Sequence, residues 1–368
     1  MHIWTHCLDR SVPKLTEAQA QRWAMGNQGG YTSPRDLLHT IATGLQIILP
    51  FDITSLYPSC QRPIEYETPT GVKRPLEEWY QGFPDIRGGM QLEDYNDRDM
   101  TDHDYTDLKP KLGMLRISYD QSELKSPVLL ANLEAGLNTA LTYVGKHEGW
   151  FTVAQVRQAY HYGVKIVLHE IEYTTNSFEP FKEYVSIFEQ KKNQADVDNK
   201  RLDDLKNSRP LTEAESDEYD ANLYRRTIAK LMLNSLPGRL NLNINRKQTM
   251  LTRNTADLVP ILADEERYKL SELQELKVGT QSVLKAVYTE GDYDYHVQQF
   301  DVAPHLSAYM LGYSKMLMAS HFKFIREIGA TPLYTDTDSI KILFENQAQV
   351  KLYTDQFVPT VKTFGGME

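Results

Sequence analysis

The chain has 368 residues, 41% of them hydrophobic, which is enough apolar material for two or more packed units. It has neither an apolar run of about 18 residues nor a signal peptide, so we expect an intracellular protein without a membrane span. Two cysteines, Cys7 and Cys60, argue against a disulfide framework and exclude a four-cysteine zinc ribbon. The net charge of −10 counts against a surface that binds nucleic acid throughout, although acidic residues can gather away from a basic channel.

The first part of the chain predicts one buried strand and then loops. The apolar run Ile47 to Ile53 predicts a strand that ends close to Asp52. Residues 60 to about 110 are rich in Pro, Gly and Asp and predict loops around short strands. The acidic stretch Glu93 to Asp107 predicts a solvated loop, because no register in it supplies the ligands and the central glycine of an EF-hand.

Helical periodicity dominates the middle of the chain. Phe151 to Gly163 predicts a helix with a glycine stop, followed by a strand. Two helices are then predicted, from Phe181 to about Asp196 and from about Glu213 to Leu236, with the charged connection DNKRLDDLKNSRP between them. A mixed region reaches to about residue 296.

The last part of the chain predicts one long helix, Ala303 to Gly329, and then a hairpin in LYTDTDSIKI, Leu333 to Ile342. Strands and helices alternate irregularly along the whole chain. This favours an α+β fold over a doubly wound parallel sheet.

Three stretches carry residues suited to chemistry. In the hairpin, an extended backbone would place Asp336 and Asp338 on the same side, where two carboxylates repel one another unless a cation compensates; an ordinary exposed turn is the alternative. In FDITSLYPS, Asp52 ends the strand, either as a ligand or as a helix N-cap, and the amides of the following turn could face an anion. Pro58 then ends the strand pattern.

The third stretch, YRRTIAKLMLNSLPG, has Arg226, Lys230 and Asn234 on one helical stripe. Such a stripe suits a triphosphate, although a plain solvated face is the alternative. A second face is suited to packing and contains Ile228, Leu231 and Ser235. Carboxylates on two strands can hold two divalent ions about 3.5–4 Å apart beside a cationic helix, which is the apparatus of in-line nucleotidyl transfer.

In this order, DITSLYPS, KLMLNSLPG and YTDTDS resemble motifs A, B and C of family B DNA polymerases, and KLMLNSL is most similar to the protein-primed branch. FKEYVSIFEQKKNQA resembles the first fingers helix of that branch, and Gly29 and Gly30 resemble its linker motif. The resemblance spans residues 28 to 368. It implies six segments: 1–45 linker-like, 46–109 palm with motif A, 110–180 an insertion that contacts the priming protein and DNA, together with palm, 181–242 fingers with motif B, 243–296 a second insertion for strand displacement, and 297–368 palm with motif C, ending before the thumb.

The resemblance also implies a role for each matching residue. The ligands of two Mg²⁺ ions, which Mn²⁺ can replace, would be Asp52, Asp338, the assisting Asp336 and the carbonyl of Ile53. The groups that contact the nucleotide would be the amides of Ser55 and Leu56, the ring of Tyr57, Lys230, Asn234 and Lys192 or its neighbour Lys191. The contacts to primer and template would be Tyr334, Thr337, Gly29, Gly30 and Gly238.

Two departures from the family pattern bear on activity. Pro237 stands where motif B has an aromatic residue that supports the new base pair, and proline tends to end a helix. The sequence also has no counterpart of the family's exonuclease and thumb. We therefore expect a DNA polymerase that uses primed template DNA, dNTPs and a priming protein. The alternatives are a non-catalytic remnant that only binds DNA or the priming protein, and an RNA-making palm enzyme, against which Tyr57 argues.

Overall fold

The structure is a computed structural model, and it describes residues 14–26, 32–34, 42–124, 128–130, 145–241, 247–279, 281–291 and 302–368. The chain divides into two compact units, one formed by Met1–Pro237 with His305–Glu368 and the other by Gly238–Pro304. Helices and antiparallel sheets make up the described residues, which confirms the α+β class. None of the described helices is long and apolar enough to cross a membrane.

The first sheet of the larger unit contains both predicted acidic strands. Its four antiparallel strands, in spatial order, are β1 (Thr32–Pro34), β14 (Thr331–Asp336), β15 (Ser339–Phe344) and β2 (Ile47–Asp52). The predicted strand and hairpin are therefore confirmed. The predicted long helix is α10 (Pro304–Glu327), which leads into β14, and α11 (Gln347–Phe357) follows β15. Apolar side chains of β15 are buried, and Phe51 packs against Tyr353 of α11 with ring centroids 4.8 Å apart.

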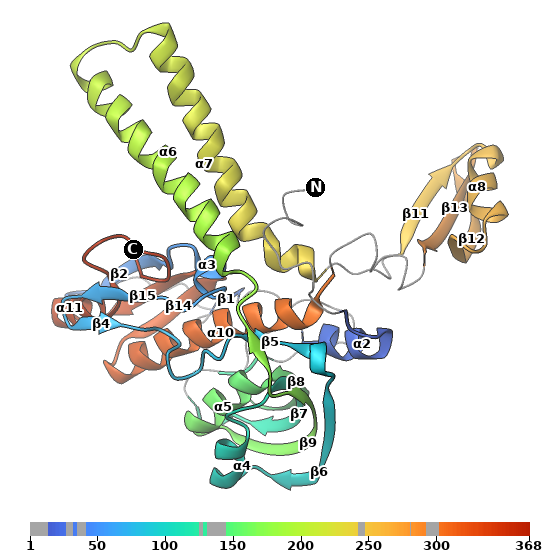
Figure 1. Cartoon of the computed structure of the whole chain (residues 1–368), viewed down its shortest axis with the longest axis horizontal. Coiled ribbons are helices and arrows are strands. Elements are labelled where there is room, and N and C mark those ends of the chain that lie inside the picture. Colours follow the sequence, from blue (N-terminus) through green and yellow to red (C-terminus); the bar gives the residue numbers. More distant parts are fainter. Residues whose placement is uncertain are drawn as a thin grey trace. The chain divides into compact units, whose positions relative to one another are not determined.

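The second sheet has the spatial order β6-β9-β7-β8 (Figure 1). Its strands are β6 (Gln91–Asp99), β9 (Lys165–Thr174), β7 (Leu112–Asp120) and β8 (Lys146–Thr152). The predicted helix α5 (Val153–His161) follows β8, and Val156 joins Leu115, Ile117 and Leu168 in one buried cluster. Short elements surround the two sheets: α2 (Glu17–Gly26), α3 (Leu56–Ser59), β3 (Tyr66–Thr68), β4 (Gly71–Lys73), β5 (Phe83–Pro84), η1 (Ile86–Gly88), and β10 (Ser177–Phe178).

The acidic stretch Glu93 to Asp107 is not a loop, as the sequence predicted, but part of strand β6 followed by helix α4 (Asp102–Asp107). Two contacts explain the difference. Asp104 accepts hydrogen bonds from the guanidinium of Arg98, and it forms a reciprocal capping box with Thr101. The pairing of Asp104 with Arg98 of β6 stabilises the strand and the helix here, which composition alone did not indicate.

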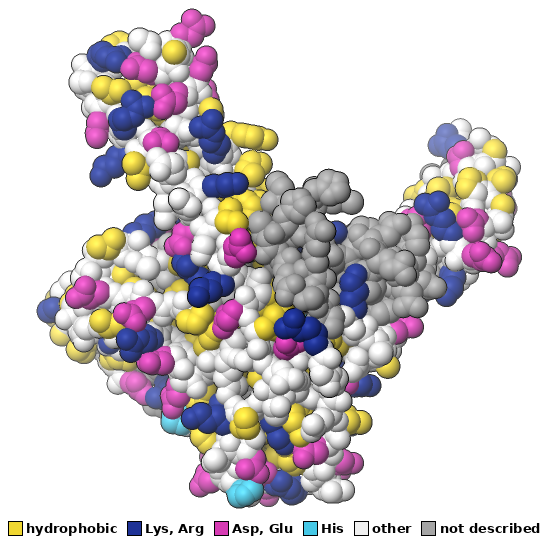
Figure 2. All heavy atoms as spheres, viewed as in Figure 1, with side chains coloured by type: hydrophobic (Ala, Val, Ile, Leu, Met, Phe, Trp, Pro, Cys, Tyr) yellow, Lys and Arg dark blue, Asp and Glu magenta, His cyan; other side chains and the backbone are white. Residues whose placement is uncertain are grey.

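Helices α6 (Lys182–Ser208) and α7 (Glu213–Leu240) form an antiparallel helical hairpin (Figure 1). The charged connection predicted between them is itself helical, because α6 continues for three further turns. All of its buried residues except Val185 recur with the spacing of a coiled-coil seam: Tyr184, Phe188, Lys192, Ala195, Asn199 and Leu202. Ion pairs such as Arg201 with Glu218 join the outer halves of the two helices, so their charges are interspersed (Figure 2).

The smaller unit is a three-stranded antiparallel sheet with a short helix against it. The sheet has the order β11-β13-β12, and β12·β13 is a long hairpin. The elements of this unit are β11 (Gln248–Thr252), η2 (Thr255–Leu258), α8 (Val259–Ala263), β12 (Tyr268–Val278) and β13 (Gln281–Glu290). The predicted mixed region is thus largely β structure.

Candidate functional site

Asp52 and Asp338, which the sequence placed in separate motifs, are brought together at one end of the first sheet. Strand β2 pairs with β15, so that Asp52 lies opposite Ser339, the residue that follows Asp338. The amide of Ile53 donates a hydrogen bond to the carbonyl of Asp338 at 2.7 Å. Backbone pairing therefore fixes both acidic residues at adjacent strand ends.

The turn between β14 and β15 separates the two acids of the hairpin. The amide of Asp338 donates to the carbonyl of Asp336 at 2.7 Å, and Thr337 between them has a φ of 57°, in the left-handed region. Asp336 is exposed whereas Asp338 is half-buried. The predicted extended backbone from Asp336 to Asp338 is therefore wrong, because the chain reverses at Thr337.

The surroundings of the two half-buried acids disfavour their charged forms. Burial, together with the charges of Asp338 and Glu368, raises the pKa of Asp52 to about 6, while Lys230 acts in the opposite direction. Burial is also the largest cause that raises the pKa of Asp338. Neither carboxylate forms an ion pair with any residue that the structure describes. Two like charges held this close favour a cation between them.

The turn after Asp52 is a single helical turn, α3, with Ser55 as its N-cap. Asp52 is therefore not the helix cap, which removes one of the two alternatives for this residue. The amides of Ser55 and Leu56 lie at the N-terminus of α3, where backbone N–H groups have no carbonyl acceptor within the helix. Tyr57 is half-buried, and burial, followed by the charges of Cys60 and Asp338, raises its pKa to about 12. The phenol is thus uncharged near Asp338 and Asp336.

The helical hairpin contributes cations to the same region. Lys192 is only 8% exposed whereas Lys191 is exposed, and which of the two binds phosphate stays a prediction. Burial lowers the pKa of Lys192, and the positive charges of Arg226, Lys362 and Lys230 lower it further. Each of these three cations therefore acts on Lys192, and two of them, Lys230 and Lys362, also act on Asp52. Asn234 is exposed on the same stripe of α7 as Arg226 and Lys230.

The second predicted face of α7 does not pack. Ile228 is 37% and Leu231 59% exposed, whereas Ala229, Leu233 and Leu236 are buried. The prediction for this face is wrong because α6 covers a different side of α7. The periodicity of one helix does not indicate which of its faces a neighbouring helix will cover.

Pro237 does not end its helix, contrary to the sequence prediction, since α7 continues to Leu240. The carbonyl of Pro237 accepts a hydrogen bond from the hydroxyl of Ser307 on α10 at 3.0 Å. Pro237 is buried and Gly238 is exposed. Its position in the last turn limits how much of the helix the proline can disturb.

The sequence analysis missed the segment after α11. Lys362 forms an ion pair with Glu368, and both charges affect the pKa of Asp52. An isolated backbone bridge joins Ile53 to Met367. The pair Gly365–Gly366 was the available signal, because consecutive glycines often mark a close backbone approach.

The remaining predicted residues are placed as follows. Tyr334 is half-buried, with the ammonium of Lys341 5.5 Å from its ring centroid. Thr337 lies in the turn already described, and Gly29 and Gly30 lie outside the described residues. Within the described part of the chain, no group of three or more His, Cys, Asp or Glu side chains is placed to hold a metal ion.

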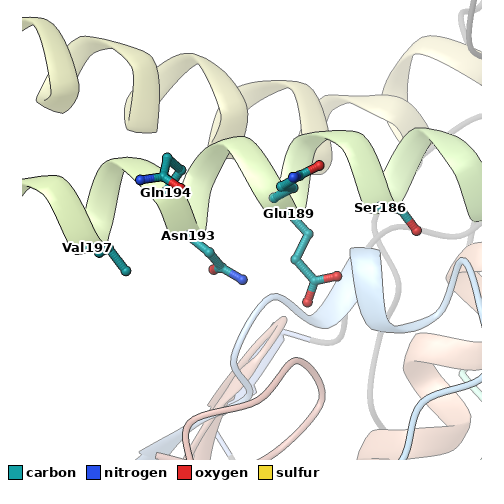
Figure 3. Close-up of a pocket in the computed structure, with 6 residues that line it drawn as sticks. Ser186, Glu189, Asn193, Gln194 and Val197 are labelled. Atoms are coloured by element: carbon teal, nitrogen blue, oxygen red, sulfur yellow. The ribbon is translucent and has the colours of Figure 1, made fainter.

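A cavity of about 380 Å³ opens along α6. Its lining comes from α6 alone: Ser186, Glu189, Gln190, Asn193, Gln194 and Val197. Figure 3 shows that the side chain of Glu189 extends away from α7, and this carboxylate pairs with Arg62. None of the predicted site residues lines the cavity, so we assign it no part in the chemistry.

A scan against protein-family models and a search of curated proteins found no match. Solved structures do match. Phi29 DNA polymerase in complex with primer-template DNA and incoming nucleotide substrates aligns with a TM-score of 0.54 and 13% identity over 97% of this chain and 48% of that one. The same polymerase with single-stranded DNA aligns with a TM-score of 0.50 and 14% identity, over 97% of this chain and 47% of that one. The chain spans about half the length of these structures. It therefore has the fold of part of Phi29 DNA polymerase, as its three motifs predicted.

Proposed function

We propose that the chain is the palm and fingers of a protein-primed family B DNA polymerase, which adds deoxynucleotides to a primer 3′-OH or to the hydroxyl of a priming protein. One observation carries the proposal: Asp52 and Asp338 lie at adjacent strand ends, and the charge of Lys230 on α7 acts on both carboxylates. The motif resemblance and the shared fold support it.

The donor set fits Mg²⁺. This ion is commonly held by one or two carboxylates, with waters and substrate phosphates completing its shell, so a third protein ligand is not required. Asp52 and Asp338 would hold the two ions, with the exposed Asp336 assisting and the Ile53 carbonyl adding an oxygen. Bound Mg²⁺ would lower the pKa of the attacking hydroxyl and neutralise charge on the leaving pyrophosphate.

The chain's own residues would position the nucleotide. Lys192 and Lys230 would bind the phosphates together with the first-turn amides of α3, because ammonium and amide donors match phosphate oxygens. The uncharged ring of Tyr57 would lie under the sugar and exclude a ribose 2′-OH. Asn234, farther along the same stripe of α7, would lie beside the new base pair.

Contacts to DNA follow from the same alignment of motifs. Tyr334 and Thr337 would lie at the primer end, and Gly238, Gly29 and Gly30 would contact the nucleic acid backbone. We further propose that 110–180 contacts the priming protein and that 243–296 opens downstream duplex. Deleting 243–296 should reduce extension through a duplex while leaving extension along single-stranded template; equal loss on both templates would contradict that role.

Primer extension tests the proposal directly. A primed DNA template is incubated with Mg²⁺ and four dNTPs, and the wild type is compared with Asp52→Asn and Asp338→Asn. We expect each substitution to reduce the rate about 10²–10³-fold, because a metal ion contributes several kcal/mol to transition-state stabilisation. Asp355→Asn is the matched control, since Asp355 is paired with Lys351 on α11 and should leave extension unchanged.

The alternative of a non-catalytic remnant is favoured by Pro237, which cannot support a base pair as an aromatic ring does. A folded wild type that binds primed DNA but gives no extension with Mg²⁺ or Mn²⁺ would overturn the catalytic proposal. Efficient incorporation of ribonucleotides would instead favour an RNA-making enzyme and contradict the role given to Tyr57.

A further inference from the structure

Lys192 of α6 lies against an aromatic ring from the other end of the chain. Its ammonium nitrogen is 4.9 Å from the ring centroid of Phe364, within the range of a cation–π contact. The ring is 5% exposed and the lysine is almost equally buried. A residue of the helical hairpin therefore rests directly on the segment that follows α11.

Phe364 is fixed by the backbone on its C-terminal side. The amide of Gly365 donates to the carbonyl of Thr54 at 2.8 Å, and the amide of Thr54 donates to Gly366 at 2.9 Å. Gly365 has a φ of +79°, and a Cβ there would lie 2.0 Å from the Ile64 side chain. The backbone can approach this closely only because Gly365 and Gly366 have no side chains, so the ring is anchored to the backbone just after Asp52.

Other positive charges surround Lys192. Arg226, Lys230 and Lys362 all act against its positive charge, and so does burial. Asp196, which acts in its favour, is itself paired with Arg226. The face of an aromatic ring attracts a cation without neutralising it. An ammonium held in this way remains available to an incoming anion, whereas one held in a tight carboxylate pair would have to break that pair.

We propose that Phe364 is a positioning residue that holds the ammonium of Lys192 in the site before the nucleotide arrives. The ring then links α6 to the backbone beside Asp52, so the position of Lys192 relative to strand β2 is fixed. The inference rests on the proposed function, because it assigns to Lys192 the triphosphate of a dNTP. Preorganisation of this kind acts on nucleotide binding rather than on the chemical step.

Steady-state kinetics with dGTP test the role. Phe364→Leu keeps an apolar side chain but removes the π face, and we expect it to raise KM about two- to fivefold, the range of a cation–π contact, with little change in kcat. Phe364→Tyr keeps the face and should restore the wild-type KM. In a Lys192→Met background, Phe364→Leu should have no further effect. Additive effects of the two substitutions, or a loss in Phe364→Tyr equal to that in Phe364→Leu, would overturn the proposal.

A second measurement does not depend on activity. In protein labelled with ¹³C-lysine, the ε-methylene resonance that disappears in Lys192→Arg identifies Lys192. We expect the ring to shift this resonance upfield, and the shift to vanish in Phe364→Leu and persist in Phe364→Tyr. A resonance at the ordinary lysine position in the wild type would overturn the proposal. An upfield resonance in a protein that extends no primer would support the contact and reject the polymerase function. Failure of the proposed contact can therefore be distinguished from failure of the proposed function.

Discussion

Asp52 and Glu368 hydrogen-bond to one another through both of their backbone amides: the amide of Asp52 donates to the carbonyl of Glu368 at 3.0 Å, and the amide of Glu368 donates to Asp52 at 2.9 Å. The pairing continues through Gly366 and Gly365 to Thr54. The position of Asp52 therefore depends on residues at the far end of the sequence. This dependence leads to the first prediction.

Replacing Gly365 should disturb the acidic strand. Gly365→Ala combines a φ of +79° with a Cβ that would overlap Ile64, and we expect it to lower the free energy of unfolding by about 2–4 kcal/mol. Gly163→Ala is the matched control, because Gly163 has a similar φ of +89° but nothing within 4 Å of its Cβ. It should destabilise by only about 1 kcal/mol. Urea unfolding measures both, and equal losses would show that crowding at Gly365 is unimportant.

Removing one charge of the acidic pair should stabilise the metal-free protein. The pKa of Asp52 is raised to about 6, so at pH 8 its carboxylate is ionised in surroundings that disfavour the charge. In EDTA at pH 8, Asp52→Asn should therefore increase stability by on the order of 1 kcal/mol, after allowance for solvent screening. Thermal unfolding is the measurement, with Asp355→Asn as a control that should not stabilise. A lower Tm for Asp52→Asn would contradict the electrostatic description of the site.

Lys315, on α10, provides a pH-dependent test outside the site. Burial lowers its pKa from 10.5 to about 7. Between these values the unfolded chain holds a proton that the folded chain has released, so the contribution of this group to stability rises with pH. Lys315→Met should be more stable than the wild type at pH 6.5, and the difference should shrink towards pH 10. Chemical unfolding at several pH values measures it, and a constant difference would show that the buried ammonium is not the cause.

The internal proline of α7 should lower the free energy of unfolding. Pro237→Ala restores an N–H that can donate to the carbonyl of Leu233, and we expect it to stabilise by about 1–3 kcal/mol in urea unfolding. Ser307→Ala, which removes the hydroxyl that donates to Pro237, should destabilise by about 1 kcal/mol. If Pro237→Ala destabilises instead, the shape that proline imposes on the last turn is required by the fold.

The sequence by itself determined the features that depend on local periodicity and on motif order. The apolar run before Asp52, the hairpin around Asp338 and the long helix α10 were recognisable because side-chain alternation repeats every two residues in a strand and about every 3.6 in a helix. The stripe of Arg226, Lys230 and Asn234 followed from the same rule. The roles proposed for these residues still rest on the resemblance and await the extension assay.

Only the tertiary structure decided what depends on contacts between distant residues. It showed that Lys192 is buried and Lys191 exposed, because α6 turns Lys192 inward. It showed that α6 extends to Ser208, because α7 covers a row of buried residues in a stretch whose composition is mostly charged. It also placed Glu368 beside Asp52. Long-range pairing is set by the packing of whole elements, so no local pattern along the chain contains this information.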